Sequence, residues 1–278
     1  MNISNFLQLY GDMMQMRQMS FNTQESYFYH LKKFMDFTPE QIDKYSSHHI
    51  RNYLIYLNGR GVSDSYFNQS INAIKFAFIY VLNRKIKDYM VLRPKRAKTQ
   101  PIILDKSEVL SLLKACDNKK HKAILMLFCT TGMRISEVIN LKIKDIDSLG
   151  GVIHIVQSKG RKDRLVPLDN DCLNILREYF KEYRPVDYLF NGSGNNYYSE
   201  SSIRQFLKKY ANVAGIKKRI YPHLLRHTYL TELLEDGNGI HEVKIVAGHQ
   251  RESTTSAYIH LSPKFISQIK SPLQNINL

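Results

Sequence analysis

Apolar residues in the first 85 positions recur at the spacing of amphipathic helices. Ser63 is a residue type that caps helix N-termini, and Asn22 with Glu25 has the spacing of a capping box. Two apolar stripes accompany these signals at helical spacing; their members are Ile50, Tyr53, Leu54 and Leu57, then Ile71, Ile74, Phe78 and Val81. The pattern predicts that residues 1–90 form a bundle of short helices.

Helical patterns resume beyond the first hundred residues. Asp105 and Glu108 have the spacing of another capping box, and a later apolar run is long enough for a buried helix. That run ends in a predicted glycine turn at Thr131-Gly132, and a second helix is predicted to begin near Arg134. Two further helices are predicted at Asp171–Tyr183 and Ser199–Ala214.

Alternating apolar and polar residues indicate a β-hairpin within this second region. Its strands are predicted at Val152–Gln157 and Arg164–Leu168, joined by the charged turn S-K-G-R-K-D. Lys159 lies at the start of the turn, where a lysine taken alone is more often solvated than functional. The predicted fold is therefore mainly α, with a helical first domain and a mixed α+β second domain over residues 102–278.

Charge distinguishes this chain more than its apolar content does. Lys and Arg number 40 against 25 Asp and Glu, which gives a formal net charge of +15. Residues 1–100 hold 14 basic and 7 acidic side chains, so both regions share the excess. Two basic regions suggest one polyanionic partner, although a solvated basic surface would give the same balance.

Residues 91–101 are predicted to be a stiff, basic and extended linker. Pro94 and Pro101 disfavour helix in the residues before them. Four cations accompany the prolines: Arg93, Lys95, Arg96 and Lys98. Such a segment is either a solvated hinge or a strap across a phosphate backbone. Because it joins two basic regions, we favour the strap and predict that these four side chains bind DNA.

The cysteine pattern indicates whether the chain binds metal, and the apolar runs indicate its cellular location. Cys116, Cys129 and Cys172 are widely spaced, which is typical of reduced cysteines. No Cys/His set has zinc spacing, so no metal is predicted. The sequence shows no signal peptide and no apolar run long enough to span a membrane. These features favour a bacterial or phage cytoplasm.

The densest polar chemistry lies in residues 221–260. His223 and Arg226 would share a face of a helix, and the Gly-His pair at 248–249 would direct His249 to the same point. Tyr258 follows nine residues later. The segments 223–227, 248–249 and 254–260 hold no acid, and Glu232, Glu235 and Asp236 are among the acids nearby. We therefore expect an excess of cationic donors that binds one anionic group beside a proton shuttle and a phenol.

Arg134 is an arginine in an unusual place. It begins a helix next to Met133 and Ile135, which should be buried. A buried guanidinium needs an anionic partner. Glu137, one turn further along, is the predicted partner.

These residues resemble the motifs of the tyrosine recombinase, or phage integrase, family. The matching segments are, in order, T-T-G-M-R-I-S-E at 130–137, the hairpin Lys159, H-L-L-R-H at 223–227, G-H at 248–249 and Tyr258 in T-T-S-A-Y-I-H. A single H-x-x-R is a weak signal, but the full ordered set is specific. Ala247 departs from the leucine that is common before Gly-His, at a packing position.

The resemblance implies a two-domain enzyme without an arm-binding domain. A SAM-like core-binding domain at 1–90 and the linker would precede a catalytic domain at 102–278, which would end in an oligomerisation segment. The reaction implied is site-specific cutting and rejoining of DNA through a covalent 3′-phosphotyrosine, for integration, excision or resolution. The implied partners are double-stranded DNA and further copies of the chain, as a homo-tetramer on two duplexes, with no cofactor.

The resemblance also assigns roles to single residues. Arg134 and Arg226 would clamp the scissile phosphate, and Tyr258 would be the nucleophile. The remaining matched positions are the general acid Lys159, the catalytic histidines His223 and His249, and the supporting residues Glu137 and His227.

Two other interpretations stay open at this point. A type IB topoisomerase shares the chemistry but relaxes supercoils without joining new partners. A DNA-binding protein without catalysis would keep the fold alone. The helical first domain and an apolar C-terminal segment favour the recombinase over the topoisomerase, and the complete set of six positions argues against a non-catalytic protein.

Overall fold

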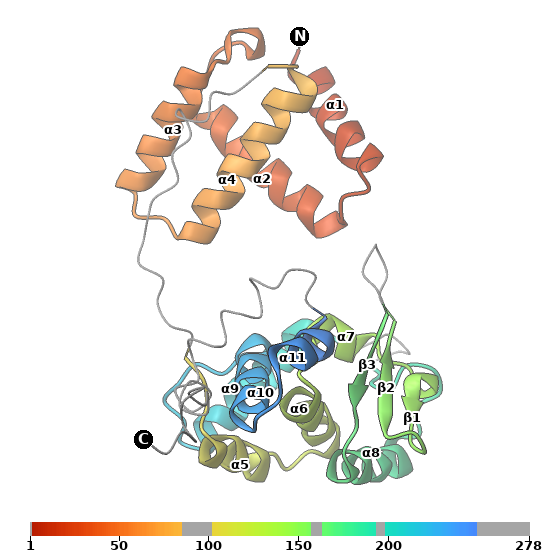
Figure 1. Cartoon of the computed structure of the whole chain (residues 1–278). Coiled ribbons are helices and arrows are strands. Elements are labelled where there is room, and N and C mark those ends of the chain that lie inside the picture. Colours follow the sequence, from red (N-terminus) through yellow and green to blue (C-terminus); the bar gives the residue numbers. More distant parts are fainter. Residues whose placement is uncertain (1, 85–101, 157–162, 193–197, 249–278) are drawn as a thin grey trace, which may run out of the picture. The chain divides into compact units, whose positions relative to one another are not determined.

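A computed structural model describes residues 2–84, 102–156, 163–192 and 198–248 of the chain. The chain divides into two compact units between Lys98 and Thr99 (Figure 1). None of the helices in the described ranges is both long and apolar enough to cross a membrane. The linker cations Arg93, Lys95, Arg96 and Lys98 lie outside the described residues.

The first unit is a bundle of helices, as the apolar stripes predict. Its main helices are α1 (Ile3–Met16), α2 (Phe21–Phe37), α3 (Ser47–Gly59) and α4 (Asp64–Phe76). A short 3₁₀ turn at Ile42–Lys44 precedes α3, and a π-helical turn at Ala77–Val81 extends α4. Helix α2 packs against α4 (Figure 1). All four residues of the first predicted stripe are buried, and so are Ile71, Ile74 and Phe78 of the second.

The helix caps of this unit agree with the sequence at one position and differ at another. The Ser63 side chain accepts a hydrogen bond from the backbone of Tyr66 at 3.2 Å and caps α4, as predicted. The predicted cap of α2 at Asn22 is wrong. The backbone of Ser20 is extended and its hydroxyl accepts from the Thr23 amide, so the helix begins at Phe21 and already includes Asn22.

The second unit combines helices with a small antiparallel sheet. Before the sheet come α5 (Lys106–Ala115), α6 (Lys119–Thr131), α7 (Ile135–Ile139) and a 3₁₀ turn at Ile143–Asp145. The strands are β1 (Ile146–Asp147), β2 (Val152–Ile155) and β3 (Arg164–Pro167), in the order β1-β2-β3. The helices that follow are α8 (Asn170–Tyr183), α9 (Glu200–Val213), α10 (Pro222–Glu235) and α11 (Ile240–Ala247).

The mainly helical fold with a small sheet is therefore confirmed. Strand β1 was not predicted, because two residues are too few to show alternation. In the predicted hairpin, Ile155 of β2 pairs with Arg164 of β3, and residues 157–162 of the turn lie outside the described residues. The predicted box of Asp105 and Glu108 caps α5 in both directions.

Helices α6 and α10 pack against each other and position the polar residues of the second unit. Helix α6 packs against α8 and α10, and α11 packs against α10 and β3 (Figure 1). Gly132 ends α6 in the left-handed conformation with φ +60°. A Cβ atom at this position would lie 2.5 Å from the Tyr229 ring of α10, so a side chain has no room here. The turn at Gly132 directs the chain into α7 beside the N-terminal half of α10.

Candidate active site

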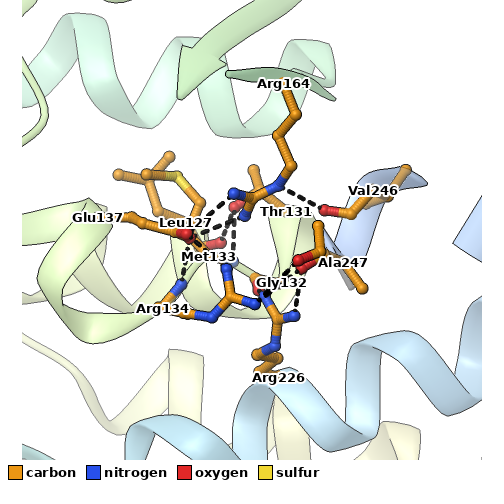
Figure 2. A network of polar contacts seen from close by, with 11 residues as sticks. Leu127, Thr131, Gly132, Met133, Arg134, Glu137, Arg164, Arg226, Val246 and Ala247 are labelled. Carbon is orange, nitrogen blue, oxygen red and sulfur yellow. Dashed lines mark hydrogen bonds and ion pairs between the residues drawn. The ribbon is translucent and has the colours of Figure 1, made fainter. Parts of the chain in front are cut away.

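Arg226 is fully enclosed by the second unit. It lies on α10, and the residue is 1% exposed. Its Nη1 donates to the Gly132 carbonyl at 2.6 Å, and its Nη2 donates to the Ala247 carbonyl at 2.6 Å (Figure 2). These two oxygens belong to the C-terminal ends of α6 and α11, where helix carbonyls carry partial negative charge. Two helix ends thus hold the guanidinium in one orientation.

Arg134 approaches the same place from the N-terminus of α7. Its Nη1 donates to Glu137 Oε1 at 2.7 Å, and its backbone amide donates to Oε2 at 2.7 Å. Its Nη2 donates to the carbonyls of Ala247 and Gly248 at 3.2 and 3.3 Å. The predicted anionic partner of Arg134 is confirmed, and Figure 2 shows the carboxylate and the guanidinium facing each other.

The two arginines meet at a single oxygen. The Ala247 carbonyl accepts from Arg226 Nη2 and from Arg134 Nη2 (Figure 2). Two cations that share one acceptor repel each other unless negative charge lies nearby. Here the C-terminal end of α11 and the Glu137 carboxylate supply it. The arrangement can bind an anion with several oxygens, because guanidinium groups donate parallel pairs of hydrogen bonds.

The expectation of a cationic cluster with few acids nearby is wrong at one point. Glu137 lies within the cluster although it is 89 positions before Arg226 in sequence. A third arginine, Arg164 of β3, binds it through two parallel hydrogen bonds of 2.9 and 2.8 Å. The side chains of Arg164 and Glu137 are 6% and 7% exposed, so this ion pair is buried.

The sequence motifs did not identify Arg164, although a signal was available. Strand residues alternate between the two faces of a sheet, and Arg164 shares a face with Val166, which is 1% exposed. A basic residue on the inward face of a strand needs a buried acceptor. Its partner Glu137 lies 27 positions earlier, beyond the reach of a local motif.

The Glu137 carboxylate stays ionised well below neutral pH. Burial alone would raise its pKa, but the hydrogen bonds and charge of Arg164, together with Arg134, outweigh burial and lower the pKa to about 2. The carboxylate is therefore a fixed negative charge between two fixed positive charges. The three groups together carry one net positive charge.

Two histidines of α10 lie beside the arginines. The ring centroids of His223 and His227 are 4.3 Å apart. Burial, followed by the charges of Arg226 and Arg134, lowers the pKa of His223. Burial, His223 and Arg226 lower the pKa of His227 to about 4. Both imidazoles are therefore neutral at pH 7, and a neutral ring nitrogen can accept a proton.

His223 also borders a pocket of about 600 Å³. The walls include Ile135, Tyr221 and two exposed arginines, Arg204 and Arg219. Among the described residues, no three His, Cys, Asp or Glu side chains gather as a metal site would require. The predicted site residues Lys159, His249 and Tyr258 lie outside the described residues. The last described residue, Gly248, ends α11 in the left-handed conformation with φ +61° and directly precedes His249.

Comparison with known proteins places these residues in a family. The phage integrase family model matches residues 103–264, and that of the phage integrase N-terminal SAM-like domain matches residues 6–88. A putative integrase/recombinase, y4qK of Sinorhizobium fredii, is 33% identical over 264 residues, which cover 94% of this chain and 86% of the relative. A tyrosine recombinase of Pseudothermotoga lettingae is 32% identical over 272 residues, which cover 93% and 94%.

A solved structure has the same fold. The crystal structure of the XerH site-specific recombinase, bound to a palindromic difH substrate, aligns with a TM-score of 0.74 at 21% identity. The alignment covers 91% of this chain and 80% of that chain. The chain belongs to the phage integrase family, and it is a tyrosine-type, site-specific DNA recombinase. The family resemblance of the motifs is thereby confirmed.

Proposed function

We propose that Arg134 and Arg226 bind the scissile phosphate of a DNA strand and that Tyr258 attacks it. The observation that carries this proposal is the convergence of both guanidiniums on the Ala247 carbonyl oxygen. Cations held this close are spaced to bind the non-bridging oxygens of one phosphate. His223, a neutral imidazole, lies on the same face of α10 as Arg226.

Both arginines are fixed before DNA arrives, and this preorganisation suits transition-state stabilisation. Attack on the phosphodiester gives a pentacoordinate phosphorus whose non-bridging oxygens carry more negative charge. Donors already aimed at that charge need no reorganisation during the reaction. Each such donor typically lowers the barrier by about 3–4 kcal/mol. Arg226 is held by two carbonyls, and Arg134 by Glu137, so neither has to be ordered on binding.

The chemical step exchanges one ester for another. The Tyr258 oxygen attacks phosphorus, the bond from phosphorus to the 5′ oxygen breaks, and a 3′-phosphotyrosine forms. A phenol with an ordinary pKa of about 10 needs a proton acceptor. Neutral His223 can act as this acceptor, and His249 is the second candidate. The leaving 5′ oxygen takes a proton from Lys159 as general acid. The 5′ hydroxyl of another strand then reverses the step, so no cofactor and no external energy source are consumed.

Glu137 and His227 support these groups without touching the phosphate. Glu137 orients Arg134 through its backbone amide and its guanidinium. His227 packs against the His223 ring, and burial with the neighbouring His223 and Arg226 lowers its own pKa to about 4. A variant of either residue should weaken cleavage less than a variant of an arginine.

DNA binding by this chain is proposed to involve both domains, at 1–90 and 102–278, and the cations of the 91–101 linker. A net charge of +15 favours phosphate contacts, whose affinity falls steeply as salt rises. We propose a homo-tetramer on two duplexes, because the sequence near the C-terminus includes the apolar residues Phe265, Ile266 and Ile269, which suit contact with a neighbouring copy. The similar recombinases are bacterial, which supports a cytoplasmic location.

Covalent trapping tests the proposal. The parent chain and Tyr258→Phe are expressed in the bacterium that carries the gene, the cells are denatured, and DNA that stays attached to the protein is sequenced. We expect attached DNA only with the parent, with its ends at one site. Equal attachment in both samples would exclude Tyr258 as the nucleophile. Ends scattered over the genome would instead favour supercoil relaxation.

A further inference from the structure

Arg164 joins three segments that are far apart in the sequence. It begins β3, opposite Ile155 at the base of the hairpin. Its Nη1 and Nη2 bind both oxygens of Glu137 on α7, at 2.9 and 2.8 Å. Its Nε donates to the Val246 carbonyl in the last turn of α11, at 2.8 Å (Figure 2). All three hydrogen bonds come from one guanidinium group that is almost fully buried.

The charge of Arg164 affects how strongly Arg134 can attract a phosphate. A guanidinium paired with a carboxylate is neutralised as a pair and attracts a phosphate weakly. Each Glu137 oxygen accepts one hydrogen bond from Arg134 and one from Arg164, since Oε1 binds both Nη1 atoms and Oε2 binds the Arg134 amide and Arg164 Nη2. With Arg164 present, the three groups together carry one net positive charge, whereas Arg134 and Glu137 alone would carry none.

Arg164 also fixes the end of α11. The carbonyls of the last helical turn have no partner within the helix, and here Arg164 binds Val246, while Arg134 and Arg226 bind Ala247. The Arg164 side chain passes directly over Gly248, where an added Cβ would lie 3.0 Å from its Cδ atom. The glycine therefore permits the contact, and the helix end that leads to His249 is held against β3.

We propose that Arg164 is a positioning residue for strand cleavage, which aligns Arg134 through Glu137 and holds the C-terminal end of α11 in place. This inference rests on the proposed roles of Arg134 and Tyr258. Arg164 does not contact the phosphate itself.

The first test compares cleavage with DNA binding. The substrate is a nicked duplex that carries the site recovered by covalent trapping, and the single-turnover rate of covalent attachment is measured together with the dissociation constant. In Arg164→Ala we expect the rate to fall on the order of 100-fold, the loss that a misplaced catalytic group produces, with little change in affinity. Arg177→Ala, which alters an exposed arginine of α8, is the matched control and should leave both quantities unchanged.

Two further variants separate positioning from a merely structural role. Arg164→Lys keeps the charge but loses the planar fork that binds both Glu137 oxygens, so it should fold normally and still cleave slowly. If Arg164 acts through Glu137, combining Arg164→Ala with Glu137→Gln should slow cleavage little more than either change alone. The proposal would be overturned if the fold-loss of cleavage rate in the double variant equalled the product of the two single losses. It would also be overturned if Arg164→Lys and Arg164→Ala both cleaved at the parental rate.

A second readout needs no activity and no DNA. Amide hydrogen exchange in the segment Ile240–Gly248 is measured for the parent, Arg164→Lys and Arg177→Ala. Loss of the Val246 contact should speed exchange in this segment about tenfold in Arg164→Lys, as the loss of one ordinary hydrogen bond does. Unchanged exchange would contradict the proposal even if the parent never cleaves DNA. Faster exchange together with a parent that does not attach to DNA would instead contradict the proposed function alone.

Discussion

The interior of the first unit is packed with aromatic rings, whereas the interior of the second unit encloses ionised side chains. Phe34 lies at the centre of the first core, with the ring centroids of Tyr45, Tyr53 and Phe78 at 5.4, 5.5 and 6.2 Å. The second unit has buried rings as well, such as Phe128 and Phe190, but it also buries the charged side chains of Arg226, Arg164 and Glu137. Both units fold around a compact apolar cluster, and they differ in whether ionised side chains are buried beside it.

This difference separates stability from chemistry. Burial of aromatic rings is stabilising wherever the rings fit together. Burial of an ion pair often gives no net stabilisation, because both groups lose their hydration. The second unit therefore retains buried charges that apolar residues could replace with little loss of stability. We infer that these charges are retained because a fixed cationic site is what a phosphate in its transition state requires.

The largest effect is expected for Arg226→Ala, which removes the most deeply buried charge. We expect cleavage to fall about 10²–10³-fold, since one preorganised donor to the transition state is lost. DNA binding should be retained, because the chain carries 40 Lys and Arg side chains that can supply other phosphate contacts. The measurement is single-turnover cleavage beside a binding titration, with Arg177→Ala as the control. Equal loss of cleavage and binding would make Arg226 a binding residue.

An effect on stability is expected for Glu137→Gln, and it should depend on pH. The pKa of Glu137 is about 2 in the folded chain and has an ordinary value of 4.5, so the folded state favours the carboxylate. That stabilisation is present above pH 4.5 and is lost as pH falls toward 2. It is on the order of 3 kcal/mol at pH 7.

Urea denaturation at several pH values measures this effect. The difference in unfolding free energy between the parent and Glu137→Gln should be largest near neutral pH and fall by about half at pH 3. A difference that stays constant over this range would show that the carboxylate is not held by Arg164 and Arg134.

The smallest effect is expected in the aromatic core. Tyr10 is fully buried, and its hydroxyl donates to the Ala73 carbonyl at 3.0 Å. Tyr10→Phe keeps the ring and removes this hydrogen bond, which should lower the free energy of unfolding by about 1 kcal/mol. The rate of cleavage by DNA-bound protein should stay at the parental value. If the activation free energy of cleavage changed by more than the free energy of unfolding, the proposed division of roles would be wrong.

The sequence predicted local features well because their signals are local. Ser63 and the Asp105–Glu108 box lie within one turn of the groups they cap. Arg134 and Glu137 also lie one turn apart, so their contact followed from spacing alone. The cap at Asn22 was misplaced because Ser20, two residues earlier, is an equally good capping residue and the apolar pattern does not distinguish them.

The sequence did not predict how distant segments meet. Arg226 binds carbonyls of Gly132 and Ala247, and backbone carbonyls carry no sequence signature. The contact of Arg164 with Glu137 depends on which face of β3 turns inward, and the position of Val166 was the available clue. Family motifs marked the residues proposed to touch the phosphate and omitted Arg164, which binds Glu137 and the Val246 carbonyl.

The most direct test of the central claim changes the phosphate instead of the protein. The scissile phosphate of the recovered site is replaced by an uncharged methylphosphonate, and cleavage by Arg226→Ala is compared on both substrates. If Arg226 acts by neutralising charge on the non-bridging oxygens, the variant should cleave the uncharged substrate far faster than the natural one. If Arg226→Ala is equally slow on both, the guanidinium has another role, and the proposed phosphate clamp is wrong.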